Sequence, residues 1–145
     1  MLMPRQPTPD LSLPLVGGGT FTLSAERWTR GTLVCFYRGL HCPICAGYLT
    51  DLERLTPAFS ERGVGTVAVT SDGADRAAAM AEKIGAAELR VAYGLPLAEA
   101  RAWGLYLSAS RGRSPLGIEE PAVFPEPGLF LVNPDRTLYY LSVQT

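Results

Sequence analysis

Two cysteines separated by two residues are the part of this sequence best suited to chemistry. Cys42 and Cys45 lie in the run His41-Cys42-Pro43-Ile44-Cys45. If a helix starts here, the two side chains share a helix face about 5–6 Å apart, within reach of a disulfide bond. The positive end of the helix would also lower the pKa of a thiol below its free value of about 8.5. The spacing therefore predicts an exposed, nucleophilic Cys42 and a more buried Cys45 that resolves a mixed disulfide.

Two neighbours of the cysteines support a helix start. Pro43 falls at the first helical position, where the missing N–H of proline costs nothing. His41 is the only histidine in the chain. When protonated it would add positive charge beside Cys42, and the alternative is that its ring simply packs in the turn.

Other uses of the cysteine pair stay open. Both could be inert core residues, because buried free cysteine is common. The chain holds three cysteines and one histidine, so a four-ligand zinc site would require Cys35, which lies in a buried apolar run. A c-type haem would require histidine after Cys45, where the chain has Ala46. We therefore expect no metal and no cofactor.

Strands and helices alternate along the chain in a way that positions this motif after a strand. Continuous apolar runs predict buried strands, and apolar residues at three- and four-residue steps predict helices. A proline inside the first helix, Pro57, is expected to kink or restart it. The second helix is expected to have Ser71 or Asp72 as its N-cap. The expected elements are a hairpin of residues 11–15 and 20–23 at the sheet edge, strands 32–37, 64–69, 89–93, 129–132 and 137–141, and helices 42–63, 72–85 and 96–103.

This order predicts an α/β fold, with a central mixed sheet flanked by helices and closed by an antiparallel hairpin. The chain stops just after the last expected strand, where such a fold usually adds one more helix. The C-terminal helix is thus expected to be missing, either because the chain is truncated or because a partner covers that face.

A long segment, Ser108–Glu126, shows neither helical nor strand periodicity and is expected to be an irregular loop. Loops of this length are often functional or mobile. It leads directly into Pro127, so it is expected to wall the active site and to select substrates. Glu126, at its end, is expected to bind substrate. Arg111 and Arg113 in it would either bind an anionic group of a substrate or lie on a solvated surface.

Composition limits the class of protein. Residues 1–145 are expected to form one domain, with 47% hydrophobic and 19% charged residues and a formal net charge of −1. This balance indicates neither a nucleic acid nor an anionic membrane as partner. The start of the chain does not resemble a secretory signal, and the odd number of cysteines suits a reducing compartment. We therefore expect a cytoplasmic protein.

Three stretches of the chain share features with a known family: Pro9–Pro14 with Thr20–Leu23, Phe36–Cys45, and Pro127–Asp135. They resemble the AhpC/TSA peroxiredoxin group of the thioredoxin-fold superfamily. The resemblance spans nearly the whole chain and implies a thioredoxin-like fold with thiol-based redox activity of an antioxidant kind.

The resemblance departs from the family at its signature positions. The family carries Pro-x-x-x-Thr-x-x-Cys and a later arginine, which fall here on Arg38, Cys42, Cys45 and Pro127. Losing the threonine and that arginine weakens the stabilisation of a breaking O–O bond. The same changes are similar to thioredoxin-like reductases, in which a cis-proline occupies the place of Pro127. That similarity implies a cis Glu126–Pro127 bond beside the cysteines, with a backbone edge open to substrate.

Three functions stay open from the sequence. The first is a thiol–disulfide oxidoreductase, the second a thiol-dependent peroxidase in which Cys45 or Cys42 attacks a hydroperoxide, and the third a redox-inert binding module. The expected partners are a disulfide-containing protein or a low-molecular-weight disulfide, and a thiol donor of the thioredoxin or glutathione system; a homodimer is a further open alternative. The motif is similar to the glutaredoxin type, which implies a potential of about −200 to −230 mV.

Overall fold

The computed structural model describes residues 2–145, and in that range it contains nine strands, three α-helices and one short 3-10 helix. In chain order they are β1 (Ser12–Pro14), β2 (Thr20–Thr22), the 3-10 helix Leu23–Ala25, β3 (Gly31–Phe36), α1 (Pro43–Glu61), β4 (Val64–Val69), α2 (Ala74–Ile84), β5 (Arg90–Ala92), α3 (Leu97–Ala102), β6 (Leu107–Ala109), β7 (Val123–Pro125), β8 (Gly128–Val132) and β9 (Leu138–Val143).

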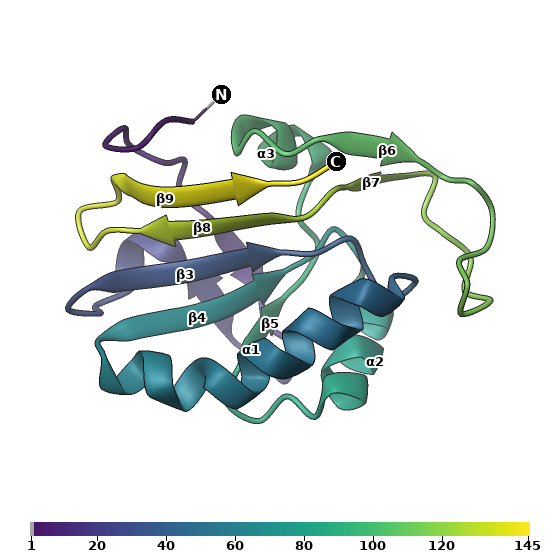
Figure 1. Cartoon of the computed structure of the whole chain (residues 1–145), viewed down its shortest axis with the longest axis horizontal. Coiled ribbons are helices and arrows are strands. Elements are labelled where there is room, and N and C mark those ends of the chain that lie inside the picture. Colours follow the sequence, from purple (N-terminus) through teal and green to yellow (C-terminus); the bar gives the residue numbers. More distant parts are fainter. Residues whose placement is uncertain (1) are drawn as a thin grey trace.

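A five-stranded sheet in the order β5-β4-β3-β8-β9 forms the centre of the molecule (Figure 1). β3, β4 and β5 are parallel, whereas β8 runs antiparallel to β3 and β9 antiparallel to β8. β3 and β4 are buried along their whole length, as their continuous apolar runs predict. The mixed sheet and its closing hairpin are confirmed.

Each face of the sheet carries its own core, because successive side chains of a strand point to opposite faces. Val34 and Phe36 pack on one face with Trp103, beneath the N-terminal hairpin and α3. Leu33 and Cys35 pack on the other face, beneath α1 and α2. The cysteine motif at the start of α1 belongs to this second face.

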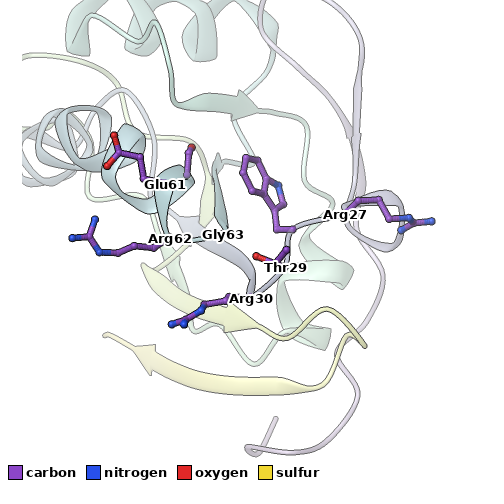
Figure 2. A pocket seen from close by; sticks show the side chains of 8 residues that line it. Arg27, Thr29, Arg30, Glu61, Arg62 and Gly63 are labelled. Atoms are coloured by element: carbon purple, nitrogen blue, oxygen red, sulfur yellow. The ribbon is translucent and has the colours of Figure 1, made fainter.

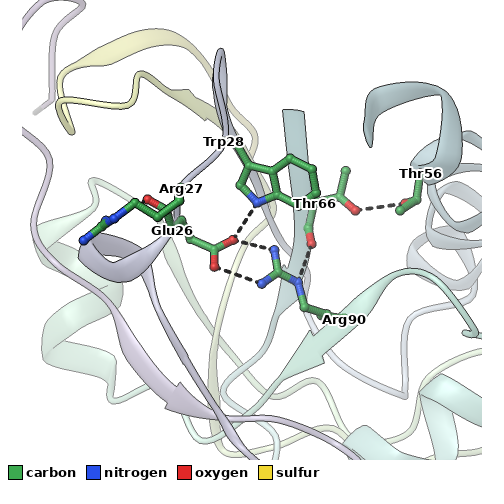
Figure 3. A network of polar contacts seen from close by, with 6 residues as sticks. All are labelled: Glu26, Arg27, Trp28, Thr56, Thr66 and Arg90. Atoms are coloured by element: carbon green, nitrogen blue, oxygen red, sulfur yellow. Dashed lines mark hydrogen bonds and ion pairs between the residues drawn. The ribbon is translucent and has the colours of Figure 1, made fainter. Parts of the chain in front are cut away.

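A polar network connects the segment before β3 with β4 and β5 (Figure 3). Arg90 of β5 donates to both carboxylate oxygens of Glu26, at 2.6 and 3.1 Å, and to the Thr66 carbonyl at 3.2 Å. Trp28 donates to the same carboxylate at 3.1 Å. A two-point arginine–carboxylate contact sets orientation as well as energy, so it ties the segment before β3 to β4 and β5.

Two expectations about the helices need correction. α1 does not restart at Pro57 but continues through it, since Pro57 is exposed and water can satisfy the carbonyl that it leaves without a donor. The N-cap of α2 is Gly73 and makes no side-chain cap. Ser71 and Asp72 are engaged elsewhere: the Ser71 hydroxyl donates to the Leu95 carbonyl at 2.7 Å, and Asp72 accepts from the connection before α1.

The expectation that Ser108–Glu126 forms an irregular loop is wrong in part. Its ends pair as β6 and β7, a two-stranded antiparallel arm that reaches away from the central sheet (Figure 1). Each strand has three residues, too few for a period of two to stand out from the surrounding glycines and prolines. Residues 110–122 connect them.

None of the helices within residues 2–145 has the length and apolar character needed to cross a bilayer.

Leu49→Ala tests the core beneath α1. Leu49 is fully buried, so the cavity left by truncation should lower the free energy of unfolding by about 2–5 kcal/mol. Leu55 on the same helix is 40% exposed, and Leu55→Ala should change it by about 0.5 kcal/mol. Equilibrium urea denaturation measures both, and equal losses would contradict this placement of the helix.

Candidate functional site

The connection from β3 to α1 brings the cysteines to the start of a helix. Gly39 in this connection has φ +150°, and a Cβ there would lie 2.8 Å from the Asp72 carboxylate. The same carboxylate accepts a hydrogen bond from the Leu40 backbone N–H at 2.9 Å. Only glycine allows this close approach, so Gly39 and Asp72 together set the path by which the chain enters α1.

Cys42 is the N-cap of α1, and its sulfur faces the first turn. The Cys45 backbone N–H donates to Cys42 Sγ at 3.2 Å, and the Tyr48 hydroxyl donates to Cys45 Sγ at 3.1 Å. Both thiols are free. Pro43 occupies the first helical position, as expected. Tyr48 was not among the site residues expected from the sequence, although its three-residue spacing from Cys45 places it on the same helix face.

The expectation that Cys42 is exposed is wrong. Its residue is 3% exposed, and Cys45 is fully buried. The helix N-cap position turns the Cys42 sulfur inward, toward the Cys45 N–H, instead of outward. Ile44, which lies between them in the sequence, is exposed instead, at 73%. Cys42 meets open space only where it borders a pocket.

The two thiols differ in acidity. Hydrogen bonding from the Cys45 thiol lowers the pKa of Cys42 to about 6, helped by the Cys45 backbone N–H and the Arg38 charge and opposed by burial. The same contact raises the pKa of Cys45, because a thiol that donates to a neighbouring thiolate holds its proton, and burial adds to this. At neutral pH the pair therefore consists of one thiolate, Cys42, and one thiol, Cys45.

Arg38 supplies the nearby positive charge. Its Nε donates to Glu126 Oε2 at 2.5 Å, and the Ser108 hydroxyl donates to Glu126 Oε1 at 2.8 Å. Burial would lower the pKa of Arg38, but the contact with Glu126 outweighs it and raises the pKa. Glu126, expected to bind substrate, is 6% exposed and both its oxygens already have partners. It anchors Arg38.

Pro127 lines the same pocket as the cysteines, but its peptide bond is not cis as expected. Every peptide bond described within residues 2–145 is trans. The chain runs from β7 into β8 in an extended form without reversing, so no tight turn requires the cis form (Figure 1). The expected open backbone edge is also absent at this carbonyl, since Pro127 accepts from the Gln144 N–H at 3.0 Å.

His41 is buried against an aromatic ring. Its ring centroid lies 4.7 Å from that of Phe124 in an edge-to-face arrangement, and neither ring nitrogen has a hydrogen-bond partner. Burial lowers the pKa of His41, with the Asp72 charge acting in the opposite direction. The imidazole is therefore uncharged at neutral pH, and the cation beside Cys42 is Arg38.

Arg111 and Arg113 are not brought to the cysteines. Both are exposed in the loop between β6 and β7, and Arg113 donates to the Gly117 carbonyl at 2.8 Å. Neither lines the pocket that contains the sulfurs.

A pocket of about 550 Å³ joins the site residues. Both cysteines line it, and its walls are mostly apolar. The lining residues are Leu33, Cys35, Phe36, Arg38, Cys42, Ile44, Cys45, Tyr48, Asp51, Leu52, Leu55, Phe59, Pro127, Gly128, Leu129, Ser142 and Gln144. Burial raises the pKa of Cys35 to about 12, so this third thiol stays protonated.

A second hollow lies at the opposite end of β3 (Figure 2). It has a volume of about 700 Å³, and it is formed by residues 27–30 and 60–63. Three arginines and Glu61 line it without cysteine or histidine. Among residues 2–145, no group of three histidine, cysteine or acidic side chains is placed to hold a metal ion.

A family model described as the AhpC/TSA family matches residues 4–141. No curated protein matches the sequence.

Three solved peroxiredoxin structures have a similar fold, each at 20% identity or less to this chain. Peroxidoxin BcpB from Mycobacterium tuberculosis has a TM-score of 0.76 at 20% identity, covering 98% of this chain and 86% of its own. A PrxQ mutant from Xylella fastidiosa has a TM-score of 0.76 at 14% identity, covering 97% and 85%. AhpC from Enterococcus faecalis has a TM-score of 0.75 at 15% identity, covering 99% and 82%. They establish a thioredoxin-like fold for this chain.

The acidity of Cys42 can be measured directly. Following thiolate absorbance against pH should show one thiolate forming near pH 6, absent in Cys42→Ser. Cys45→Ala and Arg38→Met should each raise this pKa, because each removes a group that stabilises the thiolate. Cys35→Ala is the matched control and should leave the transition unchanged. A first thiolate that forms only above pH 8, near the pKa of free cysteine, would contradict this geometry.

The buried His41 should make stability fall in acid. Its folded pKa lies below the ordinary value of 6.5, so its contribution is present above that value and is lost as pH falls through the folded pKa. His41→Phe removes the titrating group but keeps a ring against Phe124. The free energy of unfolding of the parent should therefore fall more steeply below pH 6.5 than that of the variant, and parallel curves would contradict burial of a neutral imidazole.

Proposed function

The chain belongs to the AhpC/TSA family, and on that premise we propose that this thiol-dependent oxidoreductase is a dithiol–disulfide oxidoreductase. The observation that carries the proposal is the division of charge in the pair. Cys42 has the pKa of a ready nucleophile, while Cys45 lies one helix turn away, protonated and linked to it. That division is what two-step thiol–disulfide exchange requires.

In the first step the Cys42 thiolate attacks one sulfur of a disulfide substrate. The substrate S–S bond breaks, a mixed disulfide forms, and the leaving thiolate takes a proton from solvent. Formation of the mixed disulfide removes the negative charge to which Cys45 donates, so the pKa of Cys45 then falls.

In the second step Cys45 loses its proton and attacks Cys42 Sγ, which releases the second substrate thiol. Two protein thiols become one Cys42–Cys45 disulfide, and the substrate disulfide becomes two thiols. A thiol donor of the thioredoxin or glutathione type would return the pair to its reduced form. We propose that this cycle runs within one domain and in a reducing compartment such as the cytoplasm.

A thiol-dependent peroxidase is the second candidate, and Arg38 favours it. The resemblance puts the family's late arginine at Pro127, but Arg38 lines the same pocket as Cys42 and helps to lower the pKa of that thiol. In this reaction the thiolate attacks the O–O bond, an alcohol or water leaves, and Cys42 becomes a sulfenic acid. Cys45 then condenses with it, releasing water and giving the same disulfide. Stopped-flow mixing with a hydroperoxide tests this, and a rate no faster than that of free cysteine would exclude it.

Serine variants separate the two roles in the proposed cycle. Cys42→Ser should abolish reduction of a disulfide substrate, because the nucleophile is lost. Cys45→Ser should retain the first step and accumulate a mixed disulfide on Cys42, visible by intact-mass measurement. Cys35→Ala is the control and should keep full turnover. Turnover that survives Cys42→Ser would overturn the proposal.

A further inference from the structure

One side chain at the cysteine pair has no part in the two exchange steps so far, the phenol of Tyr48. Its hydroxyl donates to Cys45 Sγ at 3.1 Å from one turn farther along α1. Cys42, Cys45 and Tyr48 follow one another at three-residue steps, so they share one face of the helix. Helical side chains lean back toward the helix start, which lets the tyrosine reach the sulfur of the preceding turn. The helix that carries both thiols therefore also fixes the donor.

The second exchange step puts negative charge on a buried sulfur. In the reduced protein the hydrogen bond to Cys42 raises the pKa of the Cys45 thiol, and burial raises it further. Formation of the mixed disulfide removes the first cause, because Cys42 no longer carries a charge, but it leaves the second. Cys45 is fully buried, so a thiolate on its sulfur depends on donors from the protein.

Few groups can supply that stabilisation. Tyr48 is the one side chain among residues 2–145 that donates to Cys45 Sγ. The Arg38 backbone also hydrogen-bonds to this sulfur, and both contacts lower the pKa of Cys45. The other titratable groups around Cys45 are Cys42, the Arg38 guanidinium, Cys35 and Tyr37. Burial raises the pKa of Cys35 and of Tyr37, so both keep their protons.

The contact between Tyr48 and Cys45 becomes stronger as the reaction proceeds. Burial raises the pKa of Tyr48, and the charge that Cys45 can carry raises it further, so the phenol stays protonated and remains a donor. A hydrogen bond to an ionised acceptor is about twice as strong as one to a neutral acceptor. An interaction that strengthens between the ground state and the transition state accelerates the step in which it does so.

We propose that Tyr48 is a catalytic residue of the second step, in which its hydroxyl donates to Cys45 Sγ while that sulfur bears negative charge and attacks Cys42 Sγ. The bond between the two cysteine sulfurs forms, and the bond from Cys42 to the substrate sulfur breaks. The released substrate thiolate takes up one proton, which balances the proton that Cys45 gave up to solvent. Tyr48 keeps its own proton throughout. This rests on the proposed function, since it requires Cys45 to be the resolving thiol.

Dithiodipyridine separates the two steps in one reaction trace. Attack by Cys42 releases one thiopyridone and resolution by Cys45 releases the second, and stopped-flow absorbance follows both. All variants carry Cys35→Ala, so the third thiol does not contribute. Tyr48→Phe keeps the ring and removes the hydroxyl. Its first release should stay within about twofold of the parent rate, whereas the second should slow about 10- to 100-fold, as expected for one hydrogen bond to a charged group.

Tyr37→Phe is the matched control. Tyr37 belongs to the same core as Cys45 and its hydroxyl is buried, but within the described chain it makes no hydrogen bond to a cysteine sulfur. Both releases should keep the parent rates in this variant. An equal slowing of the second release in the two variants, or a slowing of both releases in Tyr48→Phe, would overturn the proposal.

A titration checks that the hydroxyl acts on the charge of Cys45. Cys42→Ala leaves Cys45 with no thiolate to donate to, as in the mixed disulfide. Thiolate absorbance against pH then gives the pKa of Cys45, and Tyr48→Phe in this background should raise it by about one to two pH units. If the ring only packs against the helix, this pKa stays the same, and that result would overturn the proposal.

The outcomes distinguish this inference from the function on which it rests. If the parent releases only one thiopyridone, or if Cys45→Ser still releases the second, Cys45 is not the resolving thiol and the proposed function fails. If the parent releases both through Cys45 and Tyr48→Phe releases both at the parent rates, the function stands and the role of Tyr48 is wrong.

Discussion

One buried negative charge, the thiolate of Cys42, constrains the structure around it. A charge removed from water is costly unless hydrogen bonds and an opposite charge compensate it. Here the compensation comes from the Cys45 thiol, the Cys45 backbone N–H and Arg38, at the positive end of α1. The tight entry into the helix, with Gly39 against Asp72, keeps these groups in place around one sulfur atom.

The positive charge at this site has changed position relative to the family pattern. The resemblance puts the family's late arginine at Pro127, which has no charge to offer. In the structure Arg38 supplies a guanidinium in the pocket that Cys42 lines, and Glu126, the residue directly before Pro127, anchors it. Ser108 holds the other oxygen of Glu126, so the β6–β7 arm is joined to the thiolate through two side chains. A change in that arm is therefore expected to alter the acidity of Cys42.

The sequence predicted the parts of the fold that rest on local pattern. The buried runs became β3 and β4 almost to the residue, and Cys42 and Pro43 begin α1 as expected. The errors lie where contacts between residues far apart in the sequence determine the structure. Asp72 was expected to cap α2, but it accepts from Leu40, thirty-two positions away along the chain.

The ion pair of Arg38 with Glu126 joins residues 88 apart, and no local pattern indicates it. Cys42 was expected to be an exposed nucleophile at the helix start, yet the same N-cap geometry that lowers its pKa also turns its sulfur inward. The similarity to reductases predicted a cis bond before Pro127. The bond is trans, because the chain runs on from β7 into β8 in an extended form and makes no tight turn there.

The central claim is that Cys42 and Cys45 form a reversible redox pair. Equilibrating the protein in thiol–disulfide buffers of graded potential, then mapping the disulfide by mass spectrometry, measures this most directly. We expect one two-electron transition in the range of about −200 to −230 mV, with the disulfide joining Cys42 to Cys45. A protein that stays fully reduced across the series, or a disulfide that joins two chains, would contradict it.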